Sequence, residues 1–121
     1  MGILEKMRLD GKKGFVTGAA RGIGKASAYA LCEAGADIAI VDLDMPEAEK
    51  TAREIAEATG RDVFAVACDC TDPGQVDRMV DAVLARCGRL DIAHCNAGIC
   101  INVPAEEMTF EQWNKVISIN L

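Results

Sequence analysis

One glycine-rich stretch, residues 17–24 with the sequence TGAARGIG, restricts the fold of this chain more than any other feature. It follows a short apolar run and leads directly into a segment with helical periodicity. Glycine adopts positive φ angles and has no Cβ atom to keep a ligand away from the backbone. A helix N-terminus presents unpaired N–H groups and a positive dipole end, which suits a phosphate. Gly18, Gly22 and Gly24 are therefore candidates for a pyrophosphate cradle, although an ordinary strand–helix turn would share this pattern.

Strand-like and helix-like segments alternate along the chain, which predicts a parallel sheet with helices on both faces. Apolar runs typical of buried strands are expected at residues 14–17, 38–41, 63–68 and 90–95. The helical patterns between them end at Gly35, Gly60 and Gly88, and another begins at Phe110. On the first of these helices, the apolar face is predicted to consist of Ile23, Ala26, Ala30, Leu31 and Ala34. The predicted fold class is α/β: a Rossmann-type doubly wound parallel sheet in three α/β/α layers, with only its first four strands present.

Polar residues follow the predicted strands at their carboxyl ends, where ligands of such sheets bind. Asp42 ends the second strand, 18 residues after Gly24. Its carboxylate could accept hydrogen bonds from both ribose hydroxyls of an adenosine and would repel a 2′-phosphate, which favours NAD over NADP. Arg21 is a cation in the glycine loop and could attract a 2′-phosphate, which would favour NADP. We give Asp42 more weight, because its repulsion would be direct.

The third and fourth strands end in further candidate residues. Asp69 could accept a hydrogen bond from an adenine amino group, with the Cys70 N–H also available, or it could cap the following helix. Gly98 would let the backbone approach a cofactor, and the side chain of Asn96 could brace neighbouring strand ends. His94 lies inside an apolar strand and is interpreted as a core residue rather than a general base.

Composition and charge exclude several classes of function. The formal net charge is −6, which argues against nucleic-acid binding, because such binding requires a basic surface. There is no apolar signal segment and no run of transmembrane length, so no membrane association and a cytoplasmic location are expected. The six cysteines are expected to be free thiols, with Cys68 and Cys70 pointing to opposite faces of a strand. No C-x-x-C spacing exists, and we predict no metal site.

With these residues placed, the chain resembles the short-chain dehydrogenase/reductase family over residues 9–121. The resemblance rests on T-G-x-x-x-G-x-G from Thr17, on N-A-G from Asn96, and on the ending WNKVISINL. Cys95 is a departure, because many members carry an Asn there. The resemblance implies that Asn120 is the catalytic Asn that helps to hold a water in a proton relay. It also implies cofactor-binding roles for Thr17, Gly18, Arg21, Gly22, Ile23, Gly24, Asp42, Leu43, Asp69, Cys70, Asn96, Ala97 and Gly98.

The resemblance further implies hydride transfer between NAD(H), in preference to NADP(H), and a secondary alcohol or its ketone. Polyols and sugars are the favoured substrate class. The family's catalytic Ser and its Tyr-x-x-x-Lys pair lie beyond this length, so residues 1–121 are expected to be the N-terminal, cofactor-binding part of a single domain, inactive alone. The full-length protein is expected to be a homodimer or homotetramer. The alternatives are a non-catalytic dinucleotide-binding module and an inactive fragment that packs against another chain.

Overall fold

The computed structural model describes residues 1–121 and contains one four-stranded parallel sheet. The elements follow one another as α1 (Ile3–Lys6), β1 (Lys13–Thr17), α2 (Gly22–Glu33), β2 (Asp37–Asp42), α3 (Met45–Thr59), β3 (Val63–Ala67), α4 (Pro73–Cys87), β4 (Ile92–His94), the 3₁₀ helix η1 (Ala105–Glu107) and α5 (Phe110–Asn120). The strand order is β3-β2-β1-β4, so the chain reverses its direction of travel across the sheet after β3. This arrangement confirms the predicted Rossmann-type α/β sheet, and all four strands were expected.

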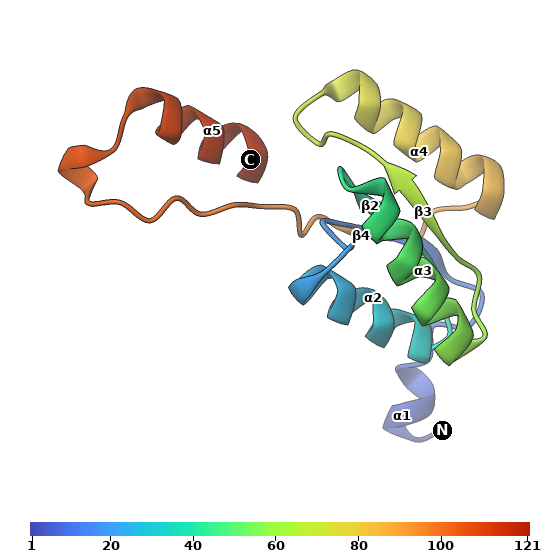
Figure 1. Ribbon diagram of the computed structural model, residues 1–121. Helices are drawn as coiled ribbons and strands as arrows, with labels where there is room; N and C mark the ends of the chain where they lie inside the picture. The colour runs from blue at the N-terminus through green and yellow to red at the C-terminus, as the bar shows by residue number, and fades with distance from the viewer.

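The two central strands, β1 and β2, are buried on both faces, which explains their apolar sequences, whereas the edge strand β4 contains no fully buried residue. Helices α2 and α3 cover one face and α4 covers the other (Figure 1). Successive side chains along each strand point alternately toward these two helical layers. The core beneath α2 and α3 includes the fully buried side chains of Val16, Ile38, Ile40 and Ile55. The core beneath α4 includes Phe15, Ala39, Val41, Phe64, Met79 and Val83.

Most of the predicted apolar face of α2 is wrong, although Leu31 packs against the core as expected. The buried residues of the helix are Gly24, Ala28 and Cys32, whereas the side chain of Ile23 is 78% exposed. These three small residues are spaced by four, and they allow the helix backbone to lie close to the sheet and to α3. The prediction was based on side-chain size and hydrophobicity. In the structure, the helix backbone lies close to the sheet, and the face that carries Gly24, Ala28 and Cys32 is the buried one.

The helix ends largely follow the predicted signals. Gly60 and Gly88 end α3 and α4 in the left-handed conformation, at φ values of 71° and 77°. Asp72 caps α4 by accepting hydrogen bonds from the N–H groups of Gly74 and Gln75. The predicted fourth strand is too long, because β4 comprises only Ile92–His94. The short helices α1 and η1 were not predicted.

Helix α5 stands apart from the sheet at the end of an extended segment (Figure 1). It contributes no buried residue, although its start is well defined by a capping box formed by Thr109 and Gln112. No helix of the structure combines the length and apolar character required to cross a bilayer.

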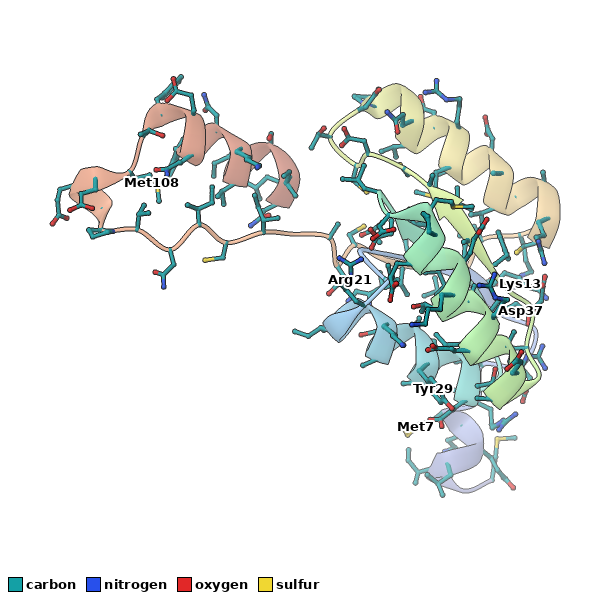
Figure 2. All side chains as sticks on the ribbon, viewed as in Figure 1. Met7, Lys13, Arg21, Tyr29, Asp37 and Met108 are labelled. Atoms are coloured by element: carbon teal, nitrogen blue, oxygen red, sulfur yellow. The ribbon has the colours of Figure 1, made fainter.

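A cluster of charged side chains joins the amino ends of the strands. Asp37 is its centre, with a side chain only 6% exposed. Its carboxylate pairs with Lys13, which lies beside it in Figure 2, and accepts hydrogen bonds from Arg61 Nε at 3.1 Å and the Asp62 N–H at 2.9 Å. Burial alone would raise the pKa of Asp37, but Lys13, the Asp62 N–H and Arg61 together hold it below its usual value. The cluster therefore contributes to stability through an ionised Asp37.

Asp37→Asn is expected to lower the free energy of unfolding at pH 7 by about 2 kcal/mol, because two cations lose their buried partner. A carboxylate with a depressed pKa stabilises the fold above the unfolded-state pKa of about 3.9. The wild-type advantage should therefore shrink as the pH falls below about 4 and through the folded-state pKa. Urea unfolding of both proteins at pH 7 and pH 3 measures this difference. The control Asp10→Asn affects an exposed pair with Arg8 and should cause no measurable change; equal losses from both variants would contradict the prediction.

Candidate functional site

A cavity of about 520 Å³ opens at the carboxyl ends of the strands. This size lies within the usual range of small-molecule sites. The glycine loop, the ends of β2 and β3, the segment after β4 and the last turn of α5 contribute to its wall. The lining residues are Gly18, Arg21, Val41, Asp42, Leu43, Cys68, Asp69, Cys70, Thr71, Ala97, Gly98, Ile99, Ser118 and Ile119.

Glycine is favoured at the three positions of the loop for different structural reasons. Gly18 and Gly22 have positive φ angles of 63° and 64°, which other residues rarely adopt. Gly24 is required by space, because a Cβ atom there would lie 2.4 Å from the Gly18 carbonyl oxygen and 2.6 Å from Asn96 Nδ2. A Cβ at Gly22 would meet nothing within 4 Å, so the start of α2 is open on this side. The loop is therefore tightly packed where Gly24 meets Gly18 and Asn96, and it is open at Gly22.

Backbone N–H groups at the start of α2 have no acceptor within the protein. Gly22, Ile23 and Gly24 occupy the first turn of the helix, where the N–H groups lack intrahelical partners, and none of them donates to a side chain or loop. No acidic side chain occupies this first turn. These N–H groups and the dipole of α2 leave room and positive potential for an anion, as a pyrophosphate cradle requires.

Asn96 and Thr17 join the glycine loop to the segment after β4. Asn96 Nδ2 donates to the carbonyl oxygens of Thr17 at 3.1 Å and Gly18 at 3.3 Å. In return, Thr17 Oγ1 accepts hydrogen bonds from the N–H groups of Asn96 and Ala97, each at 3.0 Å. The predicted bracing of strand ends by Asn96 is confirmed. Thr17 is buried behind the cavity wall, so its hydroxyl supports the loop.

Asp42 lies on the cavity wall with both carboxylate oxygens anchored. Oδ2 accepts from the Ala20 N–H and Oδ1 from the Asp44 N–H, both at 3.1 Å. The Ala20 carbonyl oxygen accepts in turn from the buried Thr51 hydroxyl at 2.5 Å. Each carboxylate oxygen has a further lone-pair direction available for a donor in the cavity. The geometry suits a group that presents two neighbouring hydroxyls.

Asp69 lies on the opposite part of the wall, at the end of β3. Its Oδ1 accepts from the hydroxyl of Thr71 at 2.7 Å and from the Thr71 N–H at 2.9 Å. These two bonds hold the pKa of Asp69 below its usual value. The helix-capping alternative is wrong for this residue, because Asp72 caps α4. Asp69 Oδ2 has no partner in the protein and lies at the cavity.

Cys68 and Cys70 both line this cavity, so the prediction that they point to opposite faces is wrong. Residues separated by two positions share one side of an extended chain, and here Cys68 directly follows β3 while Cys70 begins the turn before α4. Burial raises the pKa of Cys70 to about 11 and also raises that of Cys68. Both thiols are therefore protonated at neutral pH. No three His, Cys, Asp or Glu side chains form an arrangement that could hold a metal ion.

Asn120 closes the site from α5. Its Oδ1 accepts from the Ile99 N–H at 2.8 Å, and its Nδ2 donates to the Ile99 carbonyl oxygen at 2.9 Å. A Cβ at Gly98 would lie 3.2 Å from the same Oδ1, so glycine fits this narrow contact best. The two bonds attach the end of α5 to the segment after β4. They also occupy both polar groups of the Asn120 side chain.

Asn120→Ala is expected to release α5. Because two hydrogen bonds of about 1 kcal/mol each hold it, amide hydrogen exchange in α5 should accelerate about thirtyfold. Exchange measured by mass spectrometry, with the sheet amides as internal reference, tests this. Asn114→Ala is the matched control, since Asn114 is exposed on the same helix and makes no side-chain hydrogen bond. Equal acceleration in the two variants would show that helix propensity, not the Ile99 contact, governs α5.

Comparison with known proteins identifies this architecture. The family model described as short chain dehydrogenase matches residues 12–121, which is nearly the whole chain. The chain belongs to the short-chain dehydrogenase family. Its glycine loop, its Asn96-Ala97-Gly98 segment and the end of α5 all lie inside the matched residues.

Relatives of this chain carry the names of enzymes for different compounds. D-threitol dehydrogenase of Mycolicibacterium smegmatis is 44% identical over 114 residues, covering 94% of this chain and 44% of that protein. Sorbitol dehydrogenase of Cereibacter sphaeroides is 42% identical over 115 residues, covering 95% and 43%. The crystal structure of an NADPH-dependent 3-quinuclidinone reductase from Rhodotorula rubra superposes with a TM-score of 0.87 at 32% identity, covering 99% and 46%. The chain therefore spans a little less than half the length of these relatives.

The cavity contains most of the residues predicted from sequence. The predicted residues on its wall are Gly18, Arg21, Asp42, Leu43, Asp69, Cys70, Ala97 and Gly98. Thr17, Gly24 and Asn96 lie behind the wall as supports, and Gly22 and Ile23 lie at the open start of α2. Asn120 adjoins the wall through Ile99.

Six lining residues were missed: Val41, Cys68, Thr71, Ile99, Ser118 and Ile119. Val41, Cys68, Thr71 and Ile99 are neighbours of predicted residues, so extending each motif by one or two positions would have found them. Ser118 and Ile119 lie on α5, whose position against the loop after β4 depends on the Asn120–Ile99 contact. No local pattern in the sequence indicates this contact.

Proposed function

We propose that this chain binds NAD(H) at the carboxyl ends of its strands and forms the N-terminal, cofactor-binding part of a single-domain oxidoreductase. The observation that carries the proposal is the cavity in which Gly18 and Arg21 of the glycine loop meet Asp42 of β2. Beside it, the N–H groups at the start of α2 are free. A dinucleotide needs such an anion site next to a ribose acceptor.

Each part of the cavity would have its own role in binding. The N–H groups of Gly22, Ile23 and Gly24 would hold the pyrophosphate, while Asp42 would accept from the adenosine ribose hydroxyls. Asp69 Oδ2 would be available to the adenine amino group, with the protonated thiols of buried Cys68 and half-buried Cys70 forming an apolar wall. Ala97 and Gly98 would face the cofactor through their backbone.

The bound cofactor would supply a hydride donor or acceptor, while the protein provides binding and orientation. Asn120 Oδ1 and Nδ2 each make one hydrogen bond to Ile99, so each retains one further direction in which it could hold a water. We propose that Asn120 holds such a water and fixes the end of α5 at the cofactor. The carboxylate of Asp42 would disfavour a 2′-phosphate, which supports NAD over NADP.

The proposed substrate of the whole protein is a secondary alcohol of a polyol or sugar, or the corresponding ketone. Support comes from the two relatives above, whose names specify D-threitol and sorbitol. Residues that would carry out the proton transfer are proposed to lie outside this chain, so the chain alone should bind without turnover. We also propose that the full-length protein is a cytoplasmic homodimer or homotetramer.

Fluorescence titration of the chain with NADH tests this proposal. Saturable enhancement of NADH emission is expected, with weaker binding of NADPH and displacement of NADH by ADP-ribose. Circular dichroism of the same sample establishes that the protein is folded. A folded sample that leaves NADH emission unchanged would contradict the proposed function.

A further inference from the structure

Arg21 is the one cationic side chain that lines the cavity, and it is already paired. It precedes the first turn of α2, near the origin of the segment that leads to α5 (Figure 2). Its Nη2 lies 2.5 Å from Oδ2 of Asp44, a residue in the turn between β2 and α3. Asp44 itself does not line the cavity. The cation nearest to a bound ribose is therefore directed to a carboxylate outside the site.

Asp44 is well placed to pair with this cation. Its Oδ1 accepts from the Glu47 N–H at 3.2 Å and caps α3, which leaves Oδ2 for Arg21. The Glu47 N–H and the Arg21 guanidinium both lower the pKa of Asp44, so it is ionised at neutral pH. Its backbone N–H donates to Asp42 Oδ1, which links the two carboxylates in one turn.

We propose that Asp44 is a specificity-determining residue, which withholds Arg21 from a 2′-phosphate and so reinforces the preference for NAD over NADP. A 2′-phosphate carries about two negative charges and would place them near Asp42. A guanidinium would neutralise them through a bidentate contact. With Arg21 bound to Asp44, that compensation requires breaking an existing ion pair. This inference rests on the proposed nucleotide site.

The pair is exposed, with 66% of the Arg21 side chain and 45% of the Asp44 side chain accessible. Exposed ion pairs are weak, so breaking this pair carries only a small cost, which adds to the repulsion by Asp42. Asp44 therefore adjusts nucleotide preference through Arg21, while Asp42 would contact the ribose directly.

The decisive variant is Asp44→Asn, because asparagine caps helices about as well as aspartate and retains the start of α3. Calorimetric titration with NAD⁺ and NADP⁺ at fixed ionic strength is expected to show NADP⁺ affinity rising about fivefold, because an exposed ion pair no longer has to be broken. Affinity for NAD⁺ should change by less than about twofold, since ribose hydroxyls do not need Arg21. Asp44→Ser, another good cap, should give the same result and guards against a folding defect of one variant.

Two controls separate this role from a simple loss of negative charge. In the Arg21→Gln background, Asp44→Asn should leave the NADP⁺ affinity within about twofold, because no cation remains to be released. Glu47→Gln removes a nearby charge that acts on Arg21 without a hydrogen bond, and it should also have little effect. Equal gains from Asp44→Asn with and without Arg21, or no gain at all while NAD⁺ still binds, would overturn the inference alone. Wild-type chain that binds neither nucleotide would overturn the proposed function and this inference together.

Discussion

Gly24→Ala is expected to weaken NADH binding at least tenfold, because the new methyl group has no space. It would lie 2.4 Å from the Gly18 carbonyl oxygen and 2.6 Å from Asn96 Nδ2, which together fix the glycine loop. Backbone atoms cannot yield as a flexible side chain can, so the first turn of α2 must move. The free energy of unfolding should also fall by about 1–3 kcal/mol, although alanine is ordinarily the better helix former. NADH fluorescence titration and urea unfolding measure the two effects.

Gly74→Ala is the matched control for this substitution. Gly74 also lies in the first turn of a helix, and its nearest prospective contact is Asp72 Oδ1 at 3.3 Å. Alanine there should leave NADH affinity unchanged and alter stability by less than about 1 kcal/mol. Normal NADH affinity in Gly24→Ala would show that the loop tolerates displacement and would remove the geometric basis of the pyrophosphate cradle.

Asp42→Ala is expected to have the second large effect, on nucleotide preference. The variant loses the proposed acceptor of two ribose hydroxyls, so NAD⁺ affinity should fall between about tenfold and a hundredfold. NADP⁺ affinity should fall less, because the repulsion of its 2′-phosphate disappears at the same time. The ratio of the two dissociation constants, measured by calorimetry, should therefore move toward one.

Asp69→Ala provides the control for charge in the same cavity. It removes one carboxylate from the wall at the end of β3, away from the loop that contains Asp42. The ratio of NAD⁺ to NADP⁺ affinity should stay near the wild-type value. Asp42 also accepts from the Ala20 N–H and the Asp44 N–H, so thermal unfolding should accompany both titrations. A wild-type ratio in Asp42→Ala would refute its role as the selector.

The parts of the fold that were predictable depend on residues close together in the chain. Buried parallel strands require continuous apolar runs, and Gly60 and Gly88 end their helices through their own backbone conformation. The strand ends then follow from parallel topology, which places Asp42, Asp69 and the glycine loop at one edge. Local patterns and one topological rule thus account for most of the cavity wall.

The parts that were missed depend on contacts between distant residues. Which face of α2 is buried is decided by the close approach of its backbone to the sheet, where Ala28 and Cys32 fit and Ile23 does not. The Arg21–Asp44 pair joins residues 23 positions apart and has no local signature. The contribution of α5 to the cavity depends on the side chain of Asn120 reaching Ile99. Such contacts follow from the assembled geometry rather than from any segment alone.

The proposed function depends on the free N–H groups at the start of α2, which would hold the pyrophosphate of NAD⁺. Titrating ¹⁵N-labelled chain with NAD⁺ and following the amide resonances by NMR tests it most directly. The largest shifts are expected at Gly22, Ile23 and Gly24, with further shifts at Asp42 and Gly98, and no response at Asp37 on the opposite edge of the sheet. A folded chain whose α2 amides do not respond, or whose largest shifts lie at the amino ends of the strands, would contradict the proposed pyrophosphate site.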